Sequence, residues 1–254
     1  MNEQTVLRLF DSHIHLDLYK DPLRIIKAAE ANNIGLLAVT NAPFLFKSCR
    51  ALIPQMSTHR VALGMHPELI PEYGNQIDLF SELLSQTDFI GEVGLDYIAE
   101  KNKNNQLMQR KIFEKIMYLC SVSKNKVISI HSRGATSDVN SIVGHRFPGK
   151  IILHWFSGTA SQLENALENN FYFSINPTML RSKSGISIIE KIPLQRLLLE
   201  SDGPFVEINS QSVLPSDIFS VAHAISAIKN LDYIKTVEAI SQTSRKIFFP
   251  SDLF

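Results

Sequence analysis

Six side chains that can bind metal are distributed along this 254-residue chain. Imidazole nitrogens combined with carboxylate oxygens suit Zn²⁺ or Mn²⁺, and they tolerate Mg²⁺ when water fills the remaining positions. The residue types therefore predict a centre for divalent metal ions, made of His13, His15, Glu92, His131, His154 and Asp202.

The first two candidates are separated by a single residue, Ile14. Alternate residues of an extended backbone point the same way, so both imidazoles can meet one ion. Histidines at this spacing are also common without a metal, and an aspartate such as Asp202 before Gly203 is an ordinary start of a turn. The repetition of suitable residues along the chain favours the metal centre over these separate structural roles.

All six candidates lie in or directly after short runs typical of β-strands, and the later positions of these runs carry the polar groups. In a (β/α)8 barrel the carboxyl ends of the strands and the loops after them build the active site. Five strand ends would therefore bring these side chains to one mouth. The five runs are LRLFDSHIH, FIGEVGLD, KVISIHSR, KIILHWFSG and RLLLESDGP.

The whole chain alternates between strand-like and helix-like segments. Continuous apolar runs separated by amphipathic spacers are typical of a parallel sheet covered on both sides. In the spacer at 22–33, Leu23 and Ile26 are expected on a buried helix face, as are Leu107 and Ile116 in the spacer at 105–120. The eight strand-like runs are LRLFD, IGLLAVT, RVALGM, FIGEVGL, VISIH, IILHW, FYFSI and RLLLES.

This order predicts one (β/α)8 TIM-barrel domain over residues 1–254, with two extra helices between 215 and 249. An open doubly wound sheet is the rival topology, but its sites gather at one switch point. Ligands drawn from strands one, four, five, six and eight require a closed barrel.

Composition limits the environment and the partners. The 25 basic and 25 acidic residues cancel, so any binding to a polyanion must be local. Two cysteines without C-x-x-C spacing argue against a disulfide framework. The sequence shows no secretory leader and no long apolar stretch, so we expect a cytoplasmic protein without a membrane partner.

Six motifs together resemble those of the TatD-like metal-dependent deoxyribonucleases. The resemblance extends from Leu9 to about Phe248, with the same order and spacing. The motifs are DSHIHLD at 11–17, GMHP at 64–67, GEVGLDY at 91–97, IHSR at 130–133, HWFSG at 154–158 and ESDGP at 200–204.

The resemblance implies a barrel of the metallo-dependent hydrolase type with two divalent ions, either Mg, Mn or Zn. It also implies that His13, His15 and Asp202 hold one ion, while His131 and His154 hold the second. Glu92 would then bridge the two ions. Asp202 is the expected general base. Asp11 is expected either to orient an imidazole or to be an ordinary aspartate at the end of a strand.

The resemblance implies hydrolysis of phosphodiester bonds in DNA, which we expect in single strands or at ends. Ester or amide hydrolysis, such as removal of an aminoacyl group from transfer RNA, is an alternative, as is a non-catalytic barrel in a larger complex. Some family members belong to anti-phage defence gene clusters, so a defence role is conceivable and protein partners from a shared operon stay open.

Two departures from the family pattern concern the pocket wall. The family usually has an acidic residue where this chain has Gly134, and a cysteine where it has Trp155. Around the mouth we expect a phosphate contact from His66, a base-stacking surface from Trp155 and phosphate-docking cations. These cations are Arg133, Arg181 and Lys183, whereas His59, His145 and His223 are expected to be remote.

Overall fold

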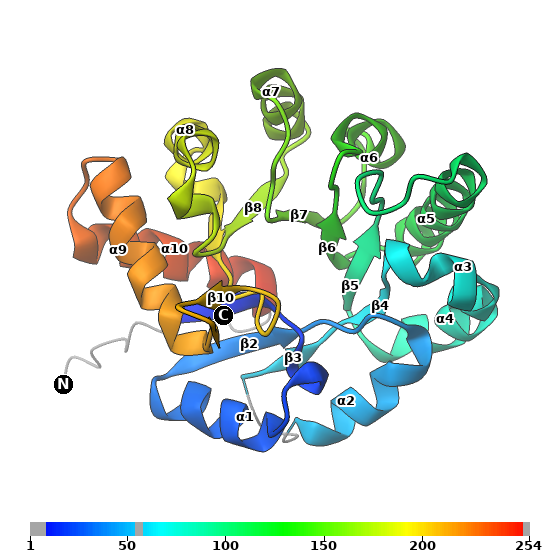
Figure 1. Cartoon of the computed structure of the whole chain (residues 1–254), viewed down its shortest axis with the longest axis horizontal. Helices are drawn as coiled ribbons and strands as arrows, with labels where there is room; N and C mark the ends of the chain where they lie inside the picture. Colours follow the sequence, from blue (N-terminus) through cyan, green and yellow to red (C-terminus); the bar gives the residue numbers. More distant parts are fainter. Residues whose placement is uncertain (1–8, 54–57, 251–254) are drawn as a thin grey trace.

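A ring of short parallel strands forms the centre of this computed structural model, which describes residues 9–53 and 58–250. The strand order is β3-β2-β1-β9-β8-β7-β6-β5-β4, and Figure 1 shows the helices outside the strands. The predicted barrel is therefore confirmed, although the start of its first run, at residues 7 and 8, lies outside the described residues. The strands are β1 (Leu9–Ile14), β2 (Ile34–Ala38), β3 (Arg60–Val61), β4 (Leu63–Met65), β5 (Phe89–Gly94), β6 (Val127–His131), β7 (Lys150–His154), β8 (Tyr172–Ile175) and β9 (Leu197–Leu199).

The third predicted strand is broken at Ala62 into β3, which pairs with β2, and β4, which pairs with β5. The Thr40 hydroxyl donates to the Ala62 carbonyl at 2.9 Å and accepts the Gly64 N–H at 3.0 Å, so a side chain replaces part of the strand ladder. A Cβ at Gly64 would lie 1.5 Å from the Thr40 carbonyl oxygen, and only glycine fits there.

Helices follow most of the strands and cover the barrel. Asp21 accepts the N–H of Arg24 and Pro22 occupies the first turn, so both start α1 in the usual way. The helices are α1 (Pro22–Ala31), α2 (Phe46–Leu52), α3 (Ile70–Tyr73), α4 (Ile77–Leu83), α5 (Lys103–Ser123), α6 (Thr136–Val143), α7 (Ala160–Glu168), α8 (Lys183–Lys191), α9 (Ile218–Ile228) and α10 (Tyr233–Phe248), with 3₁₀ turns at η1 (Leu16–Leu18), η2 (Pro43–Leu45), η3 (Pro67–Leu69), η4 (Gly74–Gln76), η5 (Leu84–Gln86), η6 (Met179–Arg181), η7 (Leu194–Arg196) and η8 (Pro215–Asp217).

The predicted helices at 22–33 and 105–120 are present, but the faces expected to be buried are partly wrong. Leu23 is 53% exposed and Leu107 is 56% exposed, whereas Ile26 and Ile116 are buried as expected. In α1 the neighbour Ile25 is buried as well, so the face that contacts the barrel is turned away from Leu23.

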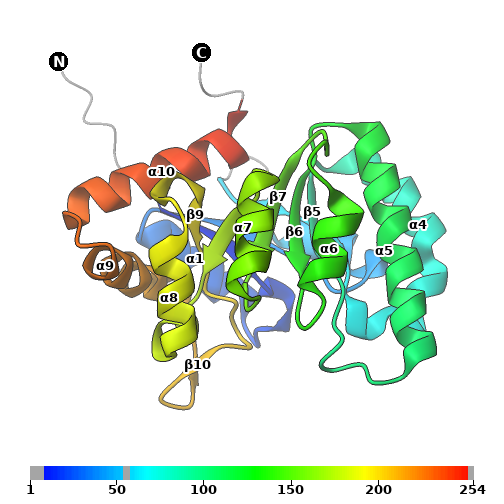
Figure 2. The ribbon, with the colours of Figure 1, turned by 90° about the horizontal axis from the view of Figure 1, so that it is seen from above.

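The amino-terminal end of the barrel is closed by α10. Figure 2 shows this helix across one end of the strands, with the small hairpin of β10 (Glu207–Ile208) and β11 (Gln211–Ser212) at the other end. The Phe248 ring stacks on the Phe10 ring with 4.0 Å between centroids, and both belong to a buried cluster with Leu37, Val127 and Leu198. Both helices predicted for the tail are present as α9 and α10, and α10 closes this end of the barrel.

None of the helices within residues 9–53 and 58–250 combines the length and the apolar character that a membrane span requires.

Candidate metal centre

The six predicted ligands meet at the carboxyl end of the barrel, around the carboxylate of Glu92 on β5. One oxygen of this group, Oε2, faces the Nε2 atoms of His13 and His15 at 3.5 and 3.3 Å. The same two nitrogens lie 3.9 and 3.6 Å from Oδ1 of Asp202. His13, His15 and Asp202 therefore form one group whose ligand atoms lie within 4.8 Å of one another.

The other oxygen of Glu92, Oε1, faces a different set of imidazoles. It lies 2.7 Å from Nδ1 of His131, 2.8 Å from Nε2 of His154 and 3.4 Å from Nε2 of His66. One carboxylate thus separates two clusters of nitrogen donors. This is the arrangement expected of a bridging ligand.

The local backbone explains how each side chain reaches this point. His13 lies in β1 and His15 directly after it, and both are buried together with the intervening Ile14. His131 and His154 are the last residues of β6 and β7. Because parallel strands end at the same rim of a barrel, side chains far apart in the sequence meet there.

Burial makes the ionisation of this cluster depend on its internal contacts. Burial alone raises the pKa of Glu92, but the charges of His66 and His154 and the hydrogen bond from His131 lower it well below its usual range. Burial lowers the pKa of His154, yet the carboxylates of Glu92 and Glu200 raise it well above the ordinary value.

The pKa of Asp202 is shifted in the opposite direction to that of Glu92. Burial, with the charges of Glu200 and Glu92, raises the pKa of Asp202 well above its usual range. Burial and the neighbouring His154 lower the pKa of His13 well below its usual value. A buried acid that resists ionisation beside a neutral imidazole is an arrangement that a bound cation stabilises.

The donor set fits a divalent ion. Nε2 of His13 is buried, has no hydrogen-bond partner and faces oxygens of both Glu92 and Asp202. Its other nitrogen, Nδ1, is 2.7 Å from the Ser129 hydroxyl, which fixes the ring. A nitrogen without a partner among carboxylate oxygens is suited to a metal ligand rather than to a structural histidine.

A cavity of about 510 Å³ opens above the cluster. His66, Arg133 and Trp155, three of the predicted substrate contacts, line it together with Phe205, which was not predicted. Trp155 is 36% exposed and Phe205 is 60% exposed. The Phe205 ring meets the His15 ring edge-on at 4.8 Å, so an aromatic surface lies directly beside the cluster.

His66 is well placed to donate a hydrogen bond. Its Nδ1 accepts the N–H of Glu68 at 3.2 Å, so the proton of the neutral ring lies on Nε2. Nε2 faces Glu92 and the cavity. A nitrogen that carries a proton donates to an acceptor, such as a phosphate oxygen. His66 also forms a group with Glu92 and His131 whose ligand atoms lie within 4.8 Å of one another.

Arg181 and Lys183 do not line this cavity. The Arg181 guanidinium donates to the carbonyl of Glu207 at 3.0 Å and so holds the β10–β11 hairpin, while Lys183 is an exposed first residue of α8. The three histidines expected to be remote, His59, His145 and His223, are also absent from the cavity lining.

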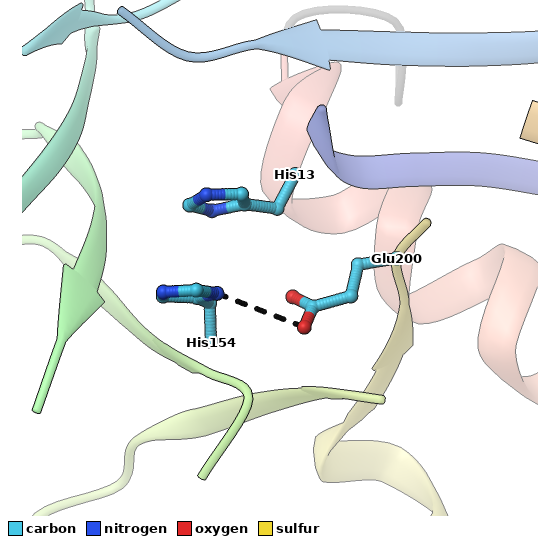
Figure 3. A group of neighbouring side chains, drawn as sticks. All are labelled: His13, His154 and Glu200. Carbon is cyan, nitrogen blue, oxygen red and sulfur yellow. Dashed lines mark ion pairs between the residues drawn. The ribbon is translucent and has the colours of Figure 1, made fainter. Parts of the chain in front are cut away.

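Two carboxylates of the site were not predicted. Asp96 Oδ2 lies 2.8 Å from Nε2 of His131. Glu200 Oε1 lies 3.7 Å from Nδ1 of His154, and Figure 3 marks this second pair with a dashed line. Glu200 precedes Asp202 by two residues, but β9 ends at Leu199 and Asp202 has φ of +51°, so the alternation argument used for His13 and His15 does not extend to this pair.

Of the two roles expected for Asp11, the structure agrees with the structural one rather than with the orientation of an imidazole. Its Oδ1 accepts the backbone N–H of Ser201 at 2.9 Å and that of His13 at 3.3 Å, and no imidazole nitrogen among the described residues lies within ion-pair distance of it. The carboxylate therefore fixes backbone at the ends of β1 and β9. Strand-end geometry alone does not distinguish these roles.

A model of the TatD related DNase family matches residues 10–249. The chain belongs to this family. TatD family proteins are metal-dependent hydrolases, and the His/Asp/Glu cluster described above is able to bind metal. The expected family is confirmed.

Known TatD-related proteins match nearly the whole chain. The metal-dependent hydrolase YabD of Bacillus subtilis is 27% identical, with 94% of this chain and 98% of YabD covered. The human deoxyribonuclease TATDN3 is 25% identical, with 94% of each chain covered. The crystal structure of YJJV, a TatD homologue from Escherichia coli, superposes with a TM-score of 0.84 at 19% identity, covering 95% of this chain and 98% of YJJV.

Both departures from the TatD pattern have structural consequences. Gly134 has φ of +68°, and a Cβ there would lie 2.8 Å from Cγ1 of Ile98, so the Ile98 side chain takes up the space of a larger residue. Trp155 has φ of +41°, and its N–H donates to Oε1 of Glu200 at 3.1 Å. Of the two positions, Trp155 lines the cavity, whereas Gly134 and its neighbour Ile98 do not.

Proposed function

We propose that this chain is a divalent-metal-dependent deoxyribonuclease that hydrolyses phosphodiester bonds in single-stranded DNA or at DNA ends. One observation carries the proposal. The two oxygens of Glu92 face two separate groups of imidazoles at the floor of a cavity. A bridging carboxylate of this kind suits two ions about 3.5 to 4 Å apart, as in two-metal phosphodiester hydrolysis.

The two ion sites would use the predicted ligands. His13, His15 and Asp202 would hold one ion, His131 and His154 the second, and Glu92 would contact both. Bound divalent ions supply charge neutralisation and a more acidic attacking water.

The protein's own residues supply the remaining steps. Asp202, which lines the cavity, accepts the proton of the attacking water as general base. The Nε2–H of His66 donates to a phosphate oxygen, and the exposed guanidinium of Arg133 offsets the phosphate charge. Asp96, in contact with His131 and 4.0 Å from Arg133, holds both groups at the site.

The shape of the cavity favours an unpaired nucleotide. A volume of about 510 Å³ is in the range of small-molecule sites. Trp155 and Phe205 present exposed aromatic faces in that cavity, and such faces stack on unpaired bases of any sequence. A duplex hides its bases and has to open before it can use these surfaces.

The test is a cleavage panel with purified, metal-free protein. We expect labelled single-stranded DNA to be cut after addition of Mg²⁺, Mn²⁺ or Zn²⁺, duplex DNA to be cut mainly at its ends, and chelator to abolish both reactions. RNA and an aminoacylated transfer RNA serve as competing substrates. Release of the aminoacyl group without any DNA cleavage would replace the nuclease by an ester hydrolase.

A further inference from the structure

Glu200 is a fully buried carboxylate at the end of β9 that none of the proposed steps uses. Figure 3 shows it pointing at His154, whose ring stacks on that of His13 with 3.9 Å between centroids and an 11° interplanar angle. Ligand atoms of these three residues lie within 4.8 Å of one another. The group therefore has two interpretations: a third ion site, or a device that positions His154.

The hydrogen bonds around Glu200 contradict an ion at this point. Oε1 accepts N–H groups from the Asn176 side chain at 3.0 Å and from the Trp155 backbone at 3.1 Å. Oε2 accepts the Ser174 hydroxyl. Three donors direct their hydrogens at this carboxylate, and a cation would have to displace them.

The position of His154 favours the second interpretation. An imidazole that binds metal through one nitrogen keeps its proton on the other and donates it to an acceptor, often a carboxylate. Nε2 of His154 faces Glu92. Its Nδ1 is buried, has no hydrogen-bond partner and faces Glu200 at 3.7 Å. Glu200 is therefore the group that would accept the Nδ1 proton when Nε2 binds an ion.

The same oxygen, Oε1 of Glu200, also accepts the backbone N–H of Trp155, the residue after His154. Trp155 has the left-handed backbone conformation, which is uncommon for residues other than glycine and has to be held by its surroundings. The bond from its N–H to Glu200 Oε1 does so, and it sets where the indole meets the cavity.

We propose that Glu200 is a positioning residue that couples the metal centre to the aromatic wall of the cavity, because one oxygen accepts the Trp155 N–H and also faces the buried Nδ1 of His154. The proposal rests on the metal centre of the proposed function but not on DNA as its substrate. If the wild-type protein binds the ions but does not cleave DNA, that result would contradict DNA as the substrate and would leave the role proposed for Glu200 intact.

Trp155 provides a direct readout because it is the only tryptophan in the chain. The experiment compares Glu200→Gln with Asp96→Asn, which removes the matching charge beside His131 without touching Trp155. Metal-free proteins are titrated with Zn²⁺ by calorimetry, and the tryptophan emission is recorded before and after. Circular dichroism and thermal unfolding verify that each variant is folded.

For wild type we expect two bound Zn²⁺ ions. Both variants should still bind two, with one weakened on the order of 10- to 100-fold, the usual effect of losing a partner of a metal-bound histidine. Only Glu200→Gln should shift the emission of the metal-free protein to longer wavelength, because the weaker acceptor releases Trp155 towards solvent.

Two results would overturn the proposal. The first is that Glu200→Gln has the same Zn²⁺ affinity and the same Trp155 emission as wild type. Glu200 would then fill space in the core without positioning either residue. The other is three ions in wild type and two in Glu200→Gln, which would make it a ligand. If Glu200→Gln does not fold, Ser174→Ala, which only removes the hydroxyl bound to Oε2, should change both readouts in the same direction, and no change would count against the proposal.

Discussion

Asp202 illustrates how one residue can have two roles that a single substitution separates. Its carboxylate lies among the first group of ligands, and burial raises its pKa. An asparagine keeps an oxygen that can bind metal but cannot accept a proton. We expect Asp202→Asn to remain folded and to bind at least one ion, and to lose on the order of 100-fold or more in turnover.

The control for this substitution is His223→Ala, since His223 lies on α9 and does not line the cavity. Cleavage rates and metal content of both variants are measured under one set of ion concentrations. If Asp202→Asn and His223→Ala had equal turnover, Asp202 would not be the general base.

The raised pKa of the buried Asp11 carboxyl leads us to expect that the stability of the fold depends on pH. Burial raises its pKa to about 7 from an ordinary value of 3.8, against the opposing hydrogen bonds from Ser201 and His13. The folded chain thus binds this proton more tightly than the unfolded chain. The resulting stabilisation is complete below about pH 4 and is lost as the pH rises towards 7.

Asp11→Asn cannot ionise and lacks this dependence. At 1.36 kcal/mol per pKa unit, the free energy of unfolding of wild type relative to Asp11→Asn should fall by about 2 to 3 kcal/mol between pH 5 and 8. Urea unfolding of the metal-free proteins across this range measures the difference, and a difference that stays constant would contradict the raised pKa.

The residues of the site could be predicted to different degrees. The expected ligands His131 and His154 end strands, and this follows from local runs that any parallel barrel brings together. The partners Asp96 and Glu200 act through contacts between different strands, and such pairings depend on the closed barrel. Local patterns therefore indicate which residues reach the mouth, but not which of them contact each other there.

At the scale of elements, the periodicity of the sequence identified where the helices lie, but it was less successful in identifying which face of each helix is buried. Leu23 has helical spacing with Ile26 but is exposed, because the barrel surface decides which side of α1 is covered. The break in the third strand depends on the Thr40 hydroxyl of the neighbouring β2–β3 connection. Both features result from packing between elements, which sequence periodicity does not contain.

The last helix offers a quantitative test of an element. Phe248 is 1% exposed and stacks on Phe10, so Phe248→Ala removes a large buried ring. We expect the free energy of unfolding to fall by about 3 to 5 kcal/mol. Phe219→Ala on α9, where the ring is 37% exposed, is the matched control and should cost less than about 1 kcal/mol. Similar unfolding midpoints for the two variants would contradict the role given to α10.

At the scale of the whole molecule, the 25 basic and 25 acidic residues balance, so the DNA binding proposed above would depend on local cations. Arg133 lines the cavity. We therefore expect Arg133→Ala to make the negative slope of log affinity against log salt shallower by about 0.7 for oligonucleotides of any length. Arg181→Ala/Lys183→Ala should make it shallower only for strands long enough to extend over the β10–β11 hairpin.

Fluorescence anisotropy with a trinucleotide and a 20-mer over a salt series separates these effects. Unchanged slopes for the double variant with the longer strand would eliminate Arg181 and Lys183 as phosphate contacts. Trp155→Ala should weaken binding at every salt concentration by the same factor, because stacking releases no counterions.

Under the nuclease function proposed above, the stacking of Phe248 beneath Phe10 would also limit how a DNA strand moves at the site. With aromatic rings closing the base of the barrel, the cavity is a dead end rather than a tunnel. A strand cannot be threaded from one side to the other, so both products leave through the opening by which the substrate came in. After each cut, the remaining strand has to retreat and dock again, and shortening from an end should therefore proceed in separate binding events.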